Sequence, residues 1–239
     1  MELPQPFDII GFGPEGWGKL LLIGTAMTIA LSAAGFALGL VLGTILAIAR
    51  LSKLKTLRFL SAFYTTIIRS VPELLVLYLL FFGASAFLST LSGLFFGEGF
   101  LGAPAFLTGV VALGLIAASF ISEVLRGAWR GVDPGQLEGA AALGLGFLVT
   151  LHQVMLPQVI RLALPGLGNI WQVTLKESAL ISLTGLTELM RQTVIAANAT
   201  ARPFYFYLTA SLLYLAITTI SALLFRKAER DSRRGFEPR

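Results

Sequence analysis

The sequence has no cysteine and only one histidine among its 239 residues. It therefore has neither a disulfide nor a thiolate metal site. A lone histidine, His152, argues against a zinc site made by protein ligands alone, so we expect no metal in this chain. A glycine-rich phosphate loop of the form G-x-x-x-x-G-K-[ST] is also absent, which predicts that the chain is not itself an ATPase.

Charged residues are scarce, at 13% of the chain against 56% hydrophobic residues. Soluble domains carry about a quarter charged residues, so this composition is typical of a membrane protein. A helix needs about 20 apolar residues to cross the ~30 Å hydrocarbon core of a bilayer. Runs of that length predict an all-α integral membrane protein with a single domain of five transmembrane helices. We expect the spans at about residues 18–50, 57–90, 103–130, 160–188 and 203–226.

The basic residues are distributed unevenly along the chain. Most of the 18 lysines and arginines lie between the first and second spans, between the third and fourth, or after the fifth. Only Lys19, Arg191 and Arg202 fall on the opposite side. The positive-inside rule then places the N-terminus outside and the C-terminus in the cytoplasm. We interpret the formal net charge of +5 as this topology signal and expect no nucleic-acid partner.

The connector between the third and fourth spans, residues 133–157, is rich in small side chains. A Pro-Gly turn opens it, and alanines predict a short helix over residues 136–143. We place Glu138 at the N-terminal end of that helix, where its charge favours the helix dipole. Gly144 predicts a break, followed by a second short helix to about Met155. The pattern suits a segment gripped closely by another protein, and an interfacial amphipathic loop is the open alternative.

The spacing within this connector resembles a known family signature. Glu138, Ala140 and Gly144, with Pro157 thirteen residues after the glycine, resemble the EAA signature of ABC importer permease subunits. Gly139 departs from the pattern, which has alanine there. In that family the loop inserts into a groove of the cytoplasmic ATPase. The resemblance assigns ATPase coupling to Glu138, Gly139, Ala140, Ala141, Gly144 and Pro157.

The resemblance covers most of the chain. Residues 69–73 are similar to the RG[TV]P segment of polar amino acid permeases, with Ser70 replacing the usual glycine. Glu123 and Arg126 fall on the E-x-x-R-G segment of that family. Residues 65–221 are most similar to the Q-type subunit of histidine/lysine/arginine/ornithine importers and of octopine and nopaline importers.

The resemblance implies a function and a set of partners. The chain would form half of the translocation pathway of an importer for polar amino acids, basic ones in particular, or opines. It would lie in a bacterial inner membrane, paired with a second permease subunit, and the Q-type resemblance favours a heterodimer. Two ATP-binding subunits, which bind ATP and Mg²⁺, and a periplasmic amino-acid-binding protein would complete the importer. This chain itself would be no enzyme and would need no cofactor.

Three ionisable residues are predicted within or at the edge of the spans. Such a residue costs about 2.5–3.5 kcal/mol on insertion scales and therefore needs a partner or a task. Our hypothesis is that Glu73 and Glu177 create a negative site for a cationic amino acid side chain. The remaining predicted substrate-binding residues, which would arrange their neighbours or bind the α-carboxylate, are Lys176, Gln172 and Ser178.

Two interpretations of Glu73 stay open. It could take part in substrate binding, or Arg69, four residues before it, could simply neutralise it on one helix face. Pro72 between them lacks a backbone N–H, so we expect a kink there that exposes polar backbone to a cavity.

Two other classes of function were compared with an importer subunit. An intramembrane enzyme is disfavoured because there is no Ser/His/Asp set, no H-E-x-x-H and no pair of membrane aspartates. A stand-alone ion-coupled carrier or channel is the remaining alternative. Five spans without an internal inverted repeat suit it poorly, whereas a subunit that gains symmetry by pairing fits them well.

Overall fold

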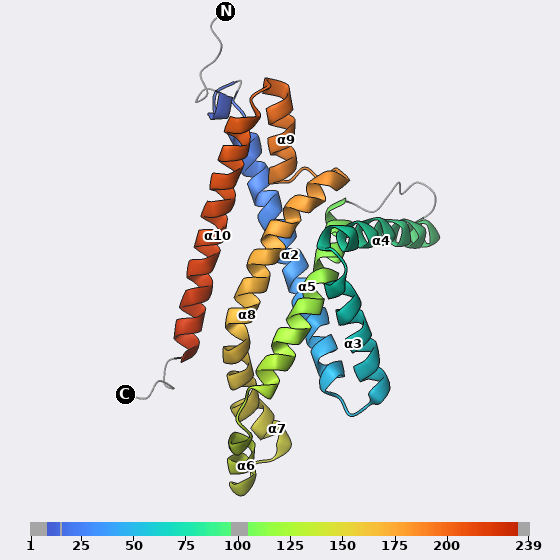
Figure 1. Cartoon of the computed structure of the whole chain (residues 1–239), viewed down its shortest axis with the longest axis vertical. Helices are drawn as coiled ribbons and strands as arrows, with labels where there is room; N and C mark the ends of the chain where they lie inside the picture. The colour runs from blue at the N-terminus through green and yellow to red at the C-terminus, as the bar shows by residue number, and fades with distance from the viewer. Residues whose placement is uncertain (1–8, 15, 97–104, 234–239) are drawn as a thin grey trace, which may run out of the picture.

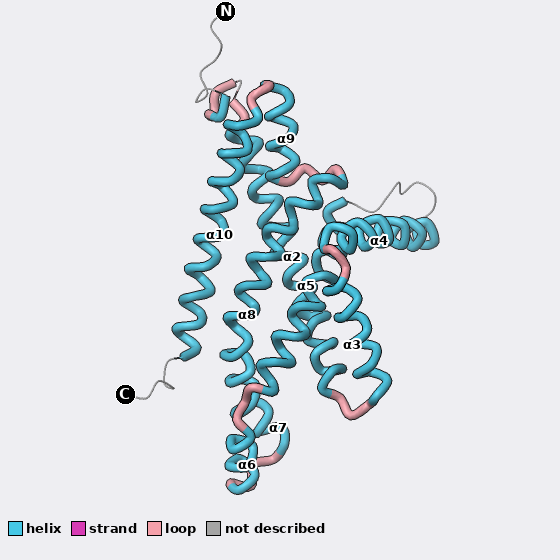
Figure 2. Tube along the Cα trace, viewed as in Figure 1, coloured by secondary structure: helices cyan, strands magenta, loops and turns pink. Residues whose placement is uncertain are grey.

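The computed structural model describes residues 9–14, 16–96 and 105–233, and its regular elements in these ranges are all helical (Figure 2). The expected all-α fold is therefore confirmed for this part of the chain. The elements are α2 (Gly18–Leu51), α3 (Lys55–Ser70), α4 (Glu73–Phe96), α5 (Ala105–Arg130), α6 (Pro134–Ala142), α7 (Phe147–Val149), a π-helical turn (Thr150–Met155), α8 (Leu156–Glu177), a 3₁₀ helix (Ser178–Thr184), α9 (Leu189–Thr200) and α10 (Pro203–Arg233).

Within the described ranges, four helices are long and apolar enough to cross a membrane: Gly18–Leu51, Ala105–Arg130, Phe147–Thr184 and Pro203–Ser232. The segment expected as the second span, residues 57–90, is not straight. It is a pair of helices, α3 and the first part of α4, bent by 117°. The number of candidate spans reaches five only when this bent pair is counted as one.

The bend follows from Pro72. Clash with the proline ring disfavours helical geometry at the preceding residue, and Val71 is extended, with φ −92° and ψ 143°. Its N–H still bonds to the carbonyl of Ile67, which closes α3, and α4 starts afresh at Glu73. The kink expected at this proline is therefore found.

The long helices lie side by side in one bundle (Figure 1). α2 and α10 run from the upper to the lower end of the bundle, α5 runs downward from the level of α4, and α8 runs back in the opposite direction. α6 and α7 lie beyond the lower end of the bundle in this view, whereas α9 lies at the upper end beside α2 and α10. α4 projects sideways from the bundle.

The closest packing in the bundle is between α2 and α5. Three buried glycines of α2, spaced by four residues, form one stripe: Gly35, Gly39 and Gly43. A Cβ added at these positions would lie only 2.8–2.9 Å from the Cβ atoms of Leu113, Ala117 and Ile121 of α5, respectively. Lipid tails are as apolar as the helix surface, so the hydrophobic effect does not drive helices together in a membrane. Their association depends instead on close van der Waals packing of this kind. The stripe thus holds α5 against α2.

We expect Gly39→Ala to destabilise the protein. The new Cβ would lie 2.8 Å from the Cβ of Ala117 and within 3.3 Å of the α5 backbone, which cannot move cheaply. Overpacking of this kind costs about 1–3 kcal/mol, and it should lower the unfolding temperature of the purified protein in detergent. Gly83→Ala in α4 is the matched control, because a Cβ there meets nothing within 4 Å. An unfolding temperature for Gly39→Ala equal to or above the wild-type value would contradict this packing.

Candidate functional site

A polar cavity of about 490 Å³ opens between α2, α3, α5 and the start of α4. Its walls carry two arginines, two glutamates, three hydroxyl side chains and one aromatic ring. These are Arg50, Thr65, Thr66, Arg69, Ser70, Glu73, Phe120 and Glu123. The break at Pro72 brings the last turn of α3 and the first residue of α4 to the same cavity. Polar groups within a membrane are tolerated where they line a cavity.

The structure brings two predicted site residues together at this cavity. The carboxyl group of Glu73 lies against that of Glu177, the last residue of α8. Glu177 is only 6% exposed, and its Oε1 has no hydrogen-bond partner among the described residues. Two carboxylates in contact repel each other, and a cation bound between them relieves that repulsion. The pair is therefore suited chemically to a cationic group.

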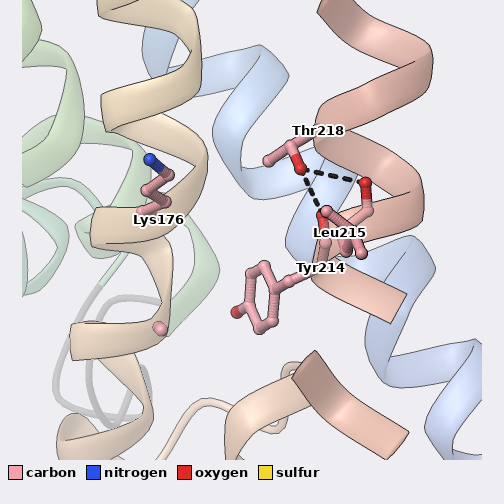
Figure 3. A pocket seen from close by; sticks show the side chains of 5 residues that line it. Lys176, Tyr214, Leu215 and Thr218 are labelled. Atoms are coloured by element: carbon pink, nitrogen blue, oxygen red, sulfur yellow. Dashed lines mark hydrogen bonds between the residues drawn. The ribbon is translucent and has the colours of Figure 1, made fainter. Parts of the chain in front are cut away.

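Lys176 and Gln172 line other cavities and not this one. Figure 3 shows Lys176 on α8 with Tyr214 and Thr218 on α10; this second cavity measures about 330 Å³. Gln172, one turn earlier on α8, lines a third cavity against α10. The expectation that both join Glu73 and Glu177 does not match this arrangement. Successive helical residues point about 100° apart, so Lys176 and Glu177 serve different faces of α8.

Ser178 is fully buried where α8 passes into the 3₁₀ helix. Its hydroxyl donates to the carbonyl of Leu175 at 2.7 Å and lies near the hydroxyl of Tyr214. Ser178 thus contacts the end of α8 and Tyr214 of α10, and its role in substrate binding stays a prediction.

Glu188 is a buried residue that the sequence analysis missed. Its carboxylate caps α9 by accepting from the backbone N–H groups of Met190 and Arg191, at 2.9 and 2.7 Å. It also accepts from the hydroxyls of Thr28 on α2, at 3.1 Å, and of Tyr214 on α10, at 3.3 Å. A glycine followed closely by an acidic residue is a helix-stop and helix-start signal, and Gly185, with φ +96°, supplies the stop. The span expected from the sequence instead extends to residue 188.

An ion network closes one side of the polar cavity. Glu123 pairs with Arg50 of α2, Nη2 to Oε1 at 3.0 Å, and with Arg126 of its own helix. Arg50 also donates to the hydroxyl of Thr65 on α3 at 2.9 Å. Arg69 instead lies over the ring of Phe120, 5.3 Å from its centroid. Within the described residues its guanidinium makes no ion pair with Glu73, so the intrahelical pairing left open above is not found.

The connector segment forms an exposed tip. Asp133 caps α6 by accepting from the N–H of Gly135 at 2.8 Å. Glu138 is therefore in the middle of the helix and not at its N-terminal end, as expected from the sequence. Gly144 closes the helix with φ +72°. Of the predicted coupling residues only Ala140 is buried, while Glu138, Gly139, Ala141, Gly144 and Pro157 are exposed.

The second half of the connector differs from expectation. The predicted short helix ending near Met155 continues without a break through the π-helical turn into α8. Pro157 lies in the first turn of α8, where its missing N–H is tolerated. Large apolar side chains nevertheless face outward at this tip: Leu143, Phe147 and Leu148 are 80%, 76% and 69% exposed. Such an apolar patch marks a protein interface or a membrane contact.

Comparison with known proteins identifies a single family. Residues 39–234 match the family described as binding-protein-dependent transport system inner membrane component. The octopine transport system permease protein of Rhizobium meliloti is 48% identical over 95% of this chain and 96% of its own length. The histidine/lysine/arginine/ornithine transport system permease protein of Escherichia coli K12 is 35% identical, over 88% of this chain and 92% of its own.

Solved structures show the same fold. An amino acid ABC transporter crystallised with histidines has a chain that superposes with a TM-score of 0.77 at 32% identity, covering 90% of this chain and 95% of that one. A chain of the inward-facing methionine ABC transporter MetNI superposes with a TM-score of 0.66 over 91% of this chain and 96% of its own, at 19% identity, which supports the fold alone.

Among the described residues no group of three or more His, Cys, Asp or Glu is placed to hold a metal ion.

The cap at Asp133 gives a direct test of the connector geometry. Asp133→Ala removes the side-chain acceptor and should destabilise α6 by about 0.5–2 kcal/mol. The amides of residues 136–142 should then exchange hydrogen faster in the purified protein. Asp133→Asn keeps an oxygen acceptor and should retain the protection. Equal exchange in wild type and Asp133→Ala would show that this cap does not stabilise the helix.

Proposed function

The chain belongs to the family of binding-protein-dependent transport system inner membrane components, the permease subunits of ATP-driven importers, and we propose that it carries basic amino acids or opines. The observation that supports this substrate class best is the contact between the Glu73 and Glu177 carboxyl groups. It offers two negative groups to one cation at a cavity lined by polar side chains. The family membership sets aside the stand-alone carrier or channel considered above.

We propose five spans, with α3 and the first part of α4 forming one broken span. In Figure 1 α2 starts at the upper end of the bundle and α10 finishes at the lower end, beyond which α6 and α7 lie. The α2–α3 turn, which carries Arg50, Lys53 and Lys55, is at the lower end as well. By the positive-inside rule this end is cytoplasmic, which puts the N-terminus outside and the C-terminus inside.

We propose that α6 is the coupling helix that docks into an ATP-binding partner. The exposed Glu138, the left-handed Gly144 and the outward-facing apolar residues at the same tip support this role. Two ATP-binding subunits would bind and hydrolyse ATP with Mg²⁺, so this chain itself would be no enzyme. A second permease subunit, forming a heterodimer, and a periplasmic amino-acid-binding protein would complete the importer in a bacterial inner membrane.

Reversing the charge of Glu138 tests the coupling role. Glu138→Lys should leave membrane insertion intact and reduce substrate-stimulated ATP hydrolysis by the reconstituted importer, because the reversed charge disturbs the docked surface. Asp231→Lys makes the same charge change at an exposed position on α10 and should leave hydrolysis near the wild-type rate. Undiminished ATP-driven uptake by Glu138→Lys would count against the docking of α6.

Removing either carboxylate charge tests the substrate site. Glu73→Gln and Glu177→Gln should each lower uptake of labelled arginine into vesicles by roughly 10- to 100-fold, since a hydrogen bond to a charged group contributes about 1.5–3 kcal/mol. Glu229→Gln on α10, which lines the third cavity, is the control. Unchanged uptake in both site variants would exclude the carboxyl pair as the binding site.

A further inference from the structure

We propose that the second permease subunit packs on a surface formed by Lys176 of α8 and three leucines of α10, and that it supplies a carboxylate to Lys176. The leucines are Leu208, Leu212 and Leu215, and we call these four residues the Lys176 face. The inference rests on the proposed function, which pairs this chain with a second permease. It adds the contact surface and the chemistry of the partner's residue.

Lys176 lies deep in the membrane. It shares a cavity with Tyr214 and Thr218 of α10 (Figure 3). α10 begins at Pro203 with an aromatic run typical of a membrane interface. Tyr214 follows Pro203 by 11 residues, which is about 16 Å along the helix axis. Half of the hydrocarbon core is about 15 Å, so the lysine is near the midplane, where a cation needs a partner.

No described residue neutralises Lys176. The ion pairs of the described chain do not include it. The adjacent Glu177 points to another face of α8 and contacts Glu73. Glu188, which contacts Tyr214, is already engaged by two hydroxyls and two backbone N–H groups. The negative partner of the lysine must therefore lie outside the described residues.

The cavity beside Lys176 opens on the outer surface of the bundle. Lys176 is exposed, and Leu215, which lines the cavity with it, is 61% exposed. Leu208 and Leu212 precede Leu215 at helical spacing and are exposed as well, so they continue an apolar stripe along α10. Lipid tails cover leucines but offer no negative group to an ammonium ion at this depth. A protein surface that is apolar except for one carboxylate matches the leucines and the lysine together.

The second permease is the subunit that can reach this surface. Of the proposed importer subunits it alone enters the hydrocarbon layer, because the ATP-binding subunits dock at the cytoplasmic tip and the binding protein is periplasmic. Charged residues within spans pair with one another across helices. A carboxylate on a span of the second permease therefore meets the depth, the charge and the apolar surroundings of Lys176.

The charge of the Lys176 face also excludes a second copy of this chain. Two copies joined on this surface by a two-fold axis would present the same residues to each other. None of the residues that line the cavity or form the leucine stripe is acidic. Such a pair would bring two lysines together, and like charges across an interface repel. The surface therefore requires a different chain and favours a heterodimer.

Carbodiimide cross-linking tests the ion pair. Membranes that contain the assembled importer would be treated with dicyclohexylcarbodiimide, a membrane-permeant reagent that joins an amine directly to a carboxyl group in contact with it. We expect a cross-link between the two permeases in a variant whose other lysines are all arginine. Adding Lys176→Arg, which keeps the charge but removes the reactive amine, should abolish the cross-link. The lysines replaced in the parent variant are Lys19, Lys53, Lys55 and Lys227.

Removing the charge tests its contribution to assembly. Lys176→Ala leaves the partner's carboxylate unpaired and should weaken the association of the two permeases by roughly 10- to 100-fold. Native mass spectrometry of the purified complex over a dilution series would measure this change. Lys176→Arg should retain the association. Lys55→Ala, which removes an exposed lysine of α3, is the matched control and should behave as wild type.

The inference and the proposed function fail in different ways. An intact complex without the cross-link, or a cross-link from Lys176 to another copy of this chain, would overturn the inference and leave the proposed function standing. Equal association of Lys176→Ala and wild type would overturn it as well. If the wild-type chain assembles with no second permease, the proposed function is wrong and the inference falls with it. If Lys176→Ala does not accumulate in the membrane, the cross-linking result decides alone.

Discussion

The close approach of α2 and α5 is the contact on which the rest of the bundle depends. Because three glycines remove side chains from the interface, the two backbones meet directly along its length. That approach brings Arg50 near the end of α2 to Glu123 on α5, and Thr65 of α3 joins the same ion network. α8 then packs on α5 through another small residue, Gly166 against Val124. The polar cavity lies between α2, α3, α5 and the start of α4, so its walls depend on this packing.

Three carboxylates of this structure lie where the helical backbone stops or bends. Glu73 begins α4 after the proline break, Glu177 ends α8 before the 3₁₀ helix, and Glu188 caps α9. Freed backbone groups and buried carboxylates both need partners in a medium without water. A break in a span therefore places carboxylates at a site. It also frees backbone groups, whose hydrogen bonds to those carboxylates stabilise the walls of the site.

Features that depend on residues close together in the chain were predictable from the sequence. Pro72 bends the chain through a steric effect on one neighbour, and the break at Gly144 in the connector was predicted from the glycine itself. The contact of Glu73 with Glu177 follows from the cost of lone charges in a span, although its role in binding stays a prediction. By contrast, the face of α8 that carries Lys176 and Gln172 is decided by packing on α10, which a helical repeat does not reveal. Glu188 was missed because its partners on α2 and α10 lie far away in sequence.

The helical rod from Phe147 to Thr184, in which a 3₁₀ segment follows Glu177, has a mechanical consequence. Its 38 residues span about 57 Å at 1.5 Å per residue, with the exposed tip at one extremity and Glu177 close to the other. The angle between the directions in which the tip and Glu177 face depends on the number of residues between them, and the π-helical turn changes that angle locally. Deleting a single residue between them would rotate the tip by about 100° about the helix axis relative to Glu177. Each end would keep its local structure, but the two would no longer face their present directions.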